Sequence, residues 1–247
     1  MYIPELLKKY SEKYSGLEMR GLHVTGYLVD RVMAINPITL DGLLSWAVVQ
    51  DAEYATGEKI PFSDRTDYPY IPLPLEELWL DERCGPLRCT SFFLSDGVSS
   101  DIEYFHKRVL RGERTKSKNP CTFGIKGVTG RWAERRTPFP VMLSDKIEAY
   151  CRGDLDEICR LLNYVTHVGK KTSAGFGLLE RWEVETADIS VQDCLVKDGL
   201  FIRNIPCDYS HEMQSDEPAV LLGWAPPYWN PSFYGKGWRF GAEKSGA

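Results

Sequence analysis

The sequence predicts an α+β fold with a ferredoxin-like βαββαβ core, a basic arm inserted into it and a C-terminal β-hairpin extension. Two observations lead to this prediction. Stretches of alternating apolar residues and stretches with apolar residues at helical spacing follow one another in the order strand, helix, strands, helix, strand. Farther along, two short β-rich runs flank Asp198 and Gly199, a dipeptide that is typical of a hairpin turn.

The first half of the core begins with residues 22–29, which alternate and are rich in β-forming residues, so we expect a strand there. Asn36 and Pro37 break the chain, and Thr39 is a suitable N-cap for a helix over residues 40–53. Proline and acidic residues are frequent over residues 54–82, so residues 54–106 are expected to form an insertion over the core. One strand is expected within this insertion, over residues 90–94.

In the second half of the core, we expect ordered structure to return at residues 139–143 and a strand to form at 146–152. Asp154 and Glu157 have the spacing of a capping box, and the helix they open is expected to end at residues 167–169. A loop over residues 169–177 then leads to a strand over 178–185. We therefore expect one domain over residues 1–190. Residues 191–247 are expected to pack on it as a hairpin over 194–205 and a tail with seven aromatic residues between 224 and 240.

Charge is unevenly distributed along the chain. The formal net charge is −5, which by itself argues against nucleic-acid binding. Between residues 107 and 136, however, ten basic residues accompany only two acidic ones, so this arm carries +8 and the remaining chain −13. The ten basic residues are Lys107, Arg108, Arg111, Arg114, Lys116, Lys118, Lys126, Arg131, Arg135 and Arg136. A basic arm on an acidic body favours a polyanionic partner.

The loop over residues 169–177 contains three glycines, two lysines and two hydroxyl side chains. Glycines allow a backbone to approach a phosphate closely and to turn N–H groups toward it, while Lys170 and Lys171 add positive charge. Phe176 offers a ring on which a base can stack. The loop matches neither a Walker A motif nor a dinucleotide-binding fingerprint. The alternative to phosphate binding is a tight helix-to-strand connection with solvated lysines.

At this point the chain resembles a known family. The matching run comprises Gly153-Asp154, an amphipathic helix, Val168-Gly169-Lys170-Lys171, Ala174-Gly175-Phe176-Gly177 and Trp182-Glu183-Val184-Glu185. It resembles the C-terminal half of RAMP-superfamily proteins, the RNA-recognition-motif-like subunits of CRISPR–Cas complexes. Residues 37–44 look like the start of that family's first helix. Together these segments most resemble the Cas-five-like subunit of type IV systems, which caps the 5′ handle of the guide RNA. The motifs cover about 45 residues, and the matching order of elements spans roughly residues 20–190.

The resemblance implies a non-catalytic, guide-RNA-capping subunit of a multi-subunit CRISPR ribonucleoprotein that targets DNA in antiviral defence. It implies that the glycine loop contacts RNA and that a basic hairpin or thumb lies mid-chain, for which residues 107–136 are the candidate. Implied partners are the guide RNA, a filament subunit and a large subunit, with contact to target DNA left open. Besides the ten arm residues, the candidate RNA-binding residues are Trp132, Gly169, Lys170, Lys171, Thr172, Ser173, Gly175, Phe176 and Gly177.

No signal peptide or apolar membrane-spanning run is recognisable, so a cytoplasmic protein with reduced thiols is expected, with no membrane partner. The spacing of Cys84 and Cys89 suits half of a zinc site, but a matching second pair is lacking and Cys121 stands alone. Incidental thiols are the better interpretation. Neither a metal nor a cofactor is expected.

Two other functions stay open. Some RAMP proteins cut RNA without a metal and use a histidine as general acid or base, so this chain is alternatively an endoribonuclease that processes CRISPR repeat RNA. The candidates are His23, His106, His167 and His211, of which His167 is closest to the expected RNA path. A histidine at a helix C-terminus also favours the helix dipole, which is the structural explanation for His167. The second alternative is a protein-interaction module that acts through the aromatic tail.

Overall fold

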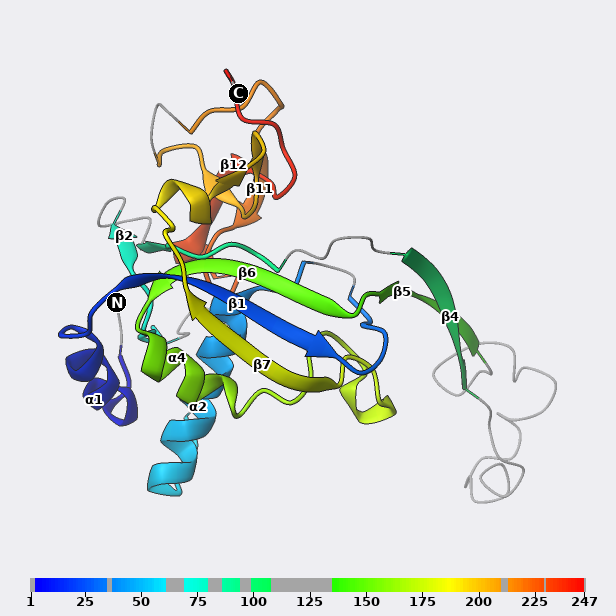
Figure 1. Cartoon of the computed structure of the whole chain (residues 1–247), viewed down its shortest axis with the longest axis horizontal. Helices are drawn as coiled ribbons and strands as arrows, with labels where there is room; N and C mark the ends of the chain where they lie inside the picture. The colour runs from blue at the N-terminus through cyan, green and yellow to red at the C-terminus, as the bar shows by residue number, and fades with distance from the viewer. Residues whose placement is uncertain are drawn as a thin grey trace, which may run out of the picture.

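The computed structural model describes most of the chain and shows a mixed α+β protein with several antiparallel sheets (Figure 1). The described residues are 3–34, 37–60, 69–79, 86–93, 99–107, 135–209, 213–228 and 230–246. Among the described helices, none has both the length and the apolar character needed to cross a membrane.

The central sheet has three antiparallel strands in the order β6-β1-β7: β1 (Arg20–Leu28), β6 (Lys146–Gly153) and β7 (Leu179–Thr186). In the register of this sheet, Val24 lies opposite Ala149 on one side and Val184 on the other. All three strands are confirmed within one or two residues of the predicted bounds.

Helices α2 (Leu40–Thr56) and α4 (Leu155–Leu162) cover one face of this sheet (Figure 1). The main core lies between them and the strands, and apolar residues of β1 such as Leu22 and Val24 are fully buried against both helices. Burial of this kind stabilises by roughly 25 cal/mol per Å² of apolar surface removed from water. Thr39 is the N-cap of α2, as predicted, although its side chain makes no capping hydrogen bond.

The capping box that the sequence predicts at α4 is only half present. Asp154 caps the helix as expected, since its carboxylate accepts a 2.9 Å hydrogen bond from the amide of Glu157. The Glu157 carboxylate does not reach back to the helix start. It turns toward the N-terminal helix α1 (Glu5–Tyr14), which the sequence analysis did not anticipate.

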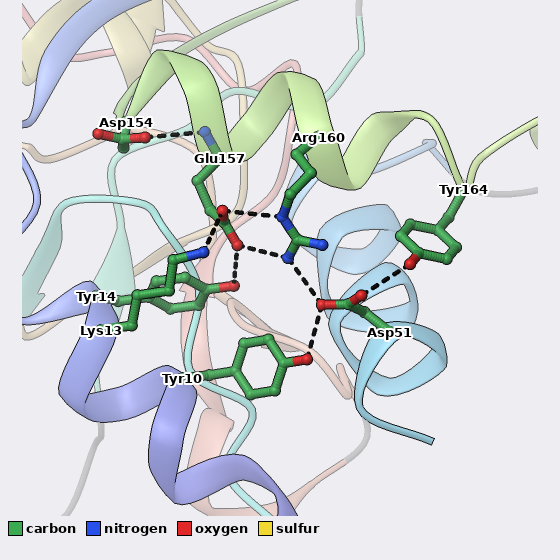
Figure 2. Close-up of polar contacts among 8 residues, drawn as sticks. All are labelled: Tyr10, Lys13, Tyr14, Asp51, Asp154, Glu157, Arg160 and Tyr164. Carbon is green, nitrogen blue, oxygen red and sulfur yellow. Dashed lines mark hydrogen bonds and ion pairs between the residues drawn. The ribbon is translucent and has the colours of Figure 1, made fainter. Parts of the chain in front are cut away.

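Figure 2 shows the polar network that joins α1, α2 and α4. The Tyr14 hydroxyl donates to Glu157 over 2.9 Å, and the Arg160 guanidinium donates to both Glu157 (2.7 Å) and Asp51 (2.8 Å). The Tyr10 hydroxyl donates to Asp51 over 2.7 Å. Burial opposes ionisation of both carboxyls, but these hydrogen bonds outweigh it and hold the pKa of Asp51 and of Glu157 below their ordinary values.

Helix α4 ends at Leu162, earlier than the predicted end at residues 167–169. The amides of Tyr164 and Val165 already bond three residues back, and His167 then forms an isolated β-bridge with Leu178. The amide of Val168 also donates to the carbonyl of Gly177 over 2.9 Å. Pairing with the segment that enters β7 therefore stops the helix before its apolar pattern ends.

The insertion contains a short ladder of β2 (Glu77–Trp79) and β3 (Pro86–Arg88). The prediction of a regular strand at residues 90–94 is wrong. Ser91 donates to the carbonyl of Tyr150 on β6, but Phe92 already turns away to donate to Ile202, so only isolated bridges form. Leu94 lies outside the described residues.

A long two-stranded ribbon, β4 (Ser99–Lys107) with β5 (Arg135–Leu143), extends away from the rest of the protein (Figure 1). Its base joins the body through β-bridge hydrogen bonds of 2.8 and 2.9 Å between Val32 and Met142. The arm predicted at residues 107–136 connects the far ends of these strands, and residues 108–134 lie outside the described residues.

The C-terminal part has its own core. The predicted hairpin is confirmed as β8 (Val196–Lys197) and β9 (Leu200–Phe201), with both turn residues at positive φ. A second sheet has the order β10-β12-β11, formed by β10 (Ile205–Pro206), β12 (Tyr234–Trp238) and β11 (Val220–Gly223). Short 3₁₀ turns lie at Thr172–Ala174, Gln192–Cys194 and Pro231–Phe233.

A buried ion pair joins the C-terminal part to helix α2. Arg203 and Asp41 both have fully buried side chains, with 3.6 Å between nitrogen and carboxylate oxygen. Arg203 also donates to the main-chain oxygens of Arg88, Thr90 and Trp224. Because a buried guanidinium needs partners for most of its donors, this arrangement fixes how the two cores meet.

Candidate nucleic-acid interface

The glycine loop, residues 169–177, lies on the surface beside the base of the ribbon. Residues 169–175 are exposed, whereas Phe176 and Gly177 are buried. Glycine is required at position 177, where φ is +67° and an added Cβ would lie 1.9 Å from the carbonyl oxygen of Val168. The sequence therefore specifies a backbone path that few other residues permit.

The loop is anchored at both ends to the segment that follows β1. The amide of Lys170 donates to the Met33 carbonyl over 2.7 Å, and the amide of Gly177 donates to the Arg31 carbonyl over 2.9 Å. Inside the loop, the amide of Gly175 donates to Thr172 over 2.9 Å. The expectation that glycine N–H groups turn toward a phosphate is wrong for Gly175 and Gly177, because main-chain carbonyls already accept hydrogen bonds from both.

Phe176 does not offer its ring to solvent, so its predicted role in base stacking is wrong. Its side chain is 6% exposed and packs with Met33 and Val141 in a small cluster between loop and ribbon. Its ring centroid lies 5.7 Å from that of Phe105 on β4. Phe176 thus holds the loop against the ribbon, because an apolar ring gains more by leaving water than by facing it.

Cations surround this aromatic cluster. The Lys171 ammonium lies 5.4 Å from the ring centroid of Phe105 and 5.5 Å from that of Phe139. The guanidinium of Arg31 lies 5.5 Å from the ring of Phe176 and 3.2 Å from the carboxylate of Glu103. The sequence analysis did not select Arg31, and no motif marks it, since its place depends on contacts with the loop and the ribbon.

The structure brings the loop to the base of the ribbon, whereas the described ends of the basic arm lie at the ribbon's far end, where β4 ends and β5 begins (Figure 1). Lys107 pairs with Arg135 there, and His106 pairs with Arg136. The acidic Asp101 and Glu103 of β4 lie between this end and the base, and Glu103 is paired with Arg31. The remaining candidates lie outside the described residues: Arg108, Arg111, Arg114, Lys116, Lys118, Lys126, Arg131 and Trp132.

One face of the ribbon exposes apolar and aromatic surface. Ile102 is 54% exposed and Tyr104 is 42% exposed, and the Arg136 guanidinium lies 3.8 Å from the Tyr104 ring centroid. Side chains alternate between the two faces of a strand, so Ile102 and Tyr104 lie opposite the face that carries Phe105. A stacked arginine and tyrosine in solvent are well suited to contact a nucleobase.

The described histidines occupy varied surroundings. His167 is not at a helix C-terminus, because α4 ends at Leu162, so the helix-dipole explanation for it is wrong. Its Nδ1 atom lies 3.0 Å from the Thr166 hydroxyl. His23 stacks on Tyr150 at a centroid distance of 5.0 Å, on the sheet face away from the helices. His211 lies outside the described residues.

The described residues contain no group of three or more histidine, cysteine or acidic side chains placed to hold a metal ion. Cys89 is fully buried, and burial raises the pKa of its thiol to about 12, so it remains protonated at neutral pH. Its predicted partner Cys84 lies outside the described residues, as does Cys121.

Comparisons with known proteins give one family match. The model of a family described as CRISPR type IV associated protein Csf3 matches residues 96–238, which include the ribbon, the glycine loop and most of the C-terminal part. Among solved structures, the chain has 10% sequence identity and a TM-score of 0.33 to a chain of a Type III-B Cmr-beta complex bound to cognate target RNA, over 74% of this chain and 67% of that one. That similarity is too low to establish a shared fold. No curated protein matches the chain.

Proposed function

The chain belongs to the CRISPR type IV associated Csf3 family, as its resemblance to type IV subunits predicted, and from this we propose that it is a non-catalytic subunit that binds and caps the 5′ handle of the guide RNA. In this proposal it is one component of a multi-subunit ribonucleoprotein that targets DNA. Its partners are the guide RNA, a filament subunit and a large subunit.

The observation that carries the proposal is the placement of the glycine loop against the ribbon. An exposed segment with two lysines and two hydroxyl side chains is held in place by a buried phenylalanine at its end. Lys170 is exposed and the Lys171 ammonium lies over the rings of Phe105 and Phe139, so the loop presents two lysines beside the ribbon base. Fixed cations beside a polar loop bind phosphates with strong salt dependence.

The ribbon extends this interface toward the basic arm. We propose that unpaired bases stack on Tyr104 and its partner Arg136, while the arm beyond them neutralises phosphates. An isolated two-stranded ribbon is only marginally stable in water, which favours a binding partner along it. A nucleic acid carries the negative charge that suits the basic residues at both ends of the ribbon, and we propose that it is the guide RNA.

The proposed RNA-recognition-motif-like core requires a fourth strand position beside β6. The segment 89–92 supplies hydrogen bonds along that edge, since Ser91 donates to Tyr150 over 2.7 Å and Arg152 donates to Cys89 over 2.9 Å. We propose that this irregular segment takes the place of the edge strand beside β6 in a ferredoxin-like sheet. The order across the sheet is then β7, β1, β6 and residues 89–92.

The alternative of a protein-interaction module acting through the aromatic tail is less favoured. Trp224, Phe233 and Trp238 are each at most 5% exposed and form the second core rather than an interface. Tyr234, at 44% exposure, remains available to a protein partner, together with Leu221 at 66%. Trp229 lies outside the described residues.

Sequencing of the nucleic acid that co-purifies with the full chain tests the proposal. We expect short RNAs that share a common 5′ segment and that dissociate as salt is raised. A preparation that retains no RNA, or RNA of random sequence, would contradict guide binding.

A second measurement tests the non-catalytic assignment. CRISPR repeat RNA incubated with the protein in EDTA is expected to stay intact. Cleavage that disappears in a His167→Ala variant would instead favour the endoribonuclease alternative.

A further inference from the structure

A groove of about 610 Å³ lies beside the glycine loop, on the side of the ribbon base. One wall is the end of β1 and the turn after it, residues 27–31, and the other is the turn from β5 to β6, residues 143–146. Ligand sites commonly have volumes of about 300–1,000 Å³, so this groove is large enough for a nucleotide.

Each wall contributes an apolar side chain that is exposed rather than buried in the core. Val29 is 59% exposed and Leu143 is 42% exposed, and both line the groove. Branched aliphatic side chains in an open slot lose unfavourable contact with water when a flat apolar group enters between them. A nucleobase is such a group.

Polar groups surround this apolar slot with both signs of charge. Arg31 and Lys146 contribute cations that are also paired with Glu103 and Glu148, and Asp30 and Asp145 contribute carboxylates. The Nε atom of Arg31 is buried and makes no hydrogen bond, since the Asp30 carboxylate lies 3.9 Å from it and the Glu103 contact uses Nη1. A cation for a phosphate, carboxylates for base N–H or ribose hydroxyl groups, and apolar walls for a base together match a nucleotide.

Main-chain hydrogen bonds join one wall of the groove to the end of the glycine loop. The amide of Val29 donates to the carbonyl of Leu178 over 2.9 Å, and the carbonyl of Arg31 accepts from Gly177 over 2.9 Å. The residues that line one wall are therefore hydrogen-bonded to the residues that end the loop. The C-terminal end of the glycine loop therefore lies beside one wall of the groove.

We propose that this groove receives one splayed-out, unpaired nucleotide of the RNA that the glycine loop holds, with its base between Val29 and Leu143 and its phosphate beside Arg31. The inference rests on the proposed RNA-binding function. Its distinctive consequence is that loss of the base in the groove weakens RNA binding by the wild type but not by a variant whose groove is filled, whereas loss of a base that stacks on Tyr104 weakens both alike.

The test is an abasic scan of the co-purified RNA sequence, made as synthetic RNAs that each lack a single base. We compare the wild-type chain with Leu143→Trp, which fills the groove without changing charge. The matched control is Leu200→Trp on β9, because Leu200 is 41% exposed, almost the same as Leu143, and does not line the groove. Circular dichroism establishes that both variants remain folded.

For the wild type and the control, loss of one base is expected to weaken binding about five- to hundredfold, the range of a single stacked base. In Leu143→Trp the intact RNA binds correspondingly less tightly, and loss of that same base has no further effect. Equal sensitivity to that base in Leu143→Trp and the wild type, or a flat scan in the wild type, would overturn the groove while leaving RNA binding intact. Failure of the wild type to bind any of these RNAs would instead overturn the proposed function.

Discussion

Neutralising the two loop lysines, Lys170→Gln with Lys171→Gln, is expected to change the salt dependence of RNA binding by a calculable amount. Each phosphate neutralised on a single strand contributes about 0.7 to the slope of log K against log salt. Both lysines are exposed, so two phosphate contacts are removed and the slope falls by about 1.4. At 0.1 M salt this corresponds to roughly 25-fold weaker binding, and the difference vanishes near 1 M.

The fold should survive this change. The Lys171 ammonium contributes cation–π contacts at 5.4 and 5.5 Å on the surface, so its loss costs about 1 kcal/mol or less in unfolding free energy. The matched control is Lys8→Gln with Lys9→Gln, an adjacent pair on α1 far along the chain from the ribbon. Filter binding across a salt series gives the slopes. An unchanged slope for the loop variant, or an equal decrease for the α1 variant, would refute phosphate binding by the loop.

Three further predictions follow from named contacts. Gly177→Ala should disrupt the loop and abolish most RNA binding, because its Cβ has no space. Gly175→Ala has open space around its Cβ, so its cost is limited to the backbone strain of an L residue at φ +92°, about 1–2 kcal/mol. Proteolysis of the loop and RNA affinity distinguish the two variants, and equal behaviour would contradict the geometry. Glu157→Gln should lower the unfolding free energy by about 2 kcal/mol, measured by urea unfolding at pH 7. Because the folded pKa of Glu157 is depressed, its carboxylate stabilises the fold above its unfolded pKa of about 4.3, and this stabilisation is lost on acidification. A variant whose stability falls with acid as steeply as that of the wild type would count against this role. Tyr104→Ala should weaken the binding of single-stranded RNA about five- to hundredfold and leave the binding of duplex RNA unchanged in gel-shift titrations. Tyr54→Ala, on the exposed face of α2, should change neither affinity.

The sequence by itself determined the features that depend on neighbouring residues. Alternation at residues 22–29 specifies a half-buried strand, and the spacing of Asp154 before an apolar stripe specifies where α4 begins. Asp198 and Gly199 specify the hairpin turn because both residues must adopt positive φ. The order of these motifs also gave the correct family, since the family match includes the glycine loop.

Only the tertiary structure decided which side chains face solvent and which partners they meet. Phe176 points inward because Phe105 and Val141 of the ribbon lie beneath the loop and pack against its ring. The Glu157 carboxylate accepts a hydrogen bond from Tyr14, which is 143 residues away in sequence, and does not cap the start of its own helix. Helix ends, buried charges and grooves depend on such long-range contacts, and their energies outweigh local preferences of a few tenths of a kcal/mol per residue. The place of Arg31 between loop, ribbon and groove is therefore a property of the fold, and no local pattern encodes it.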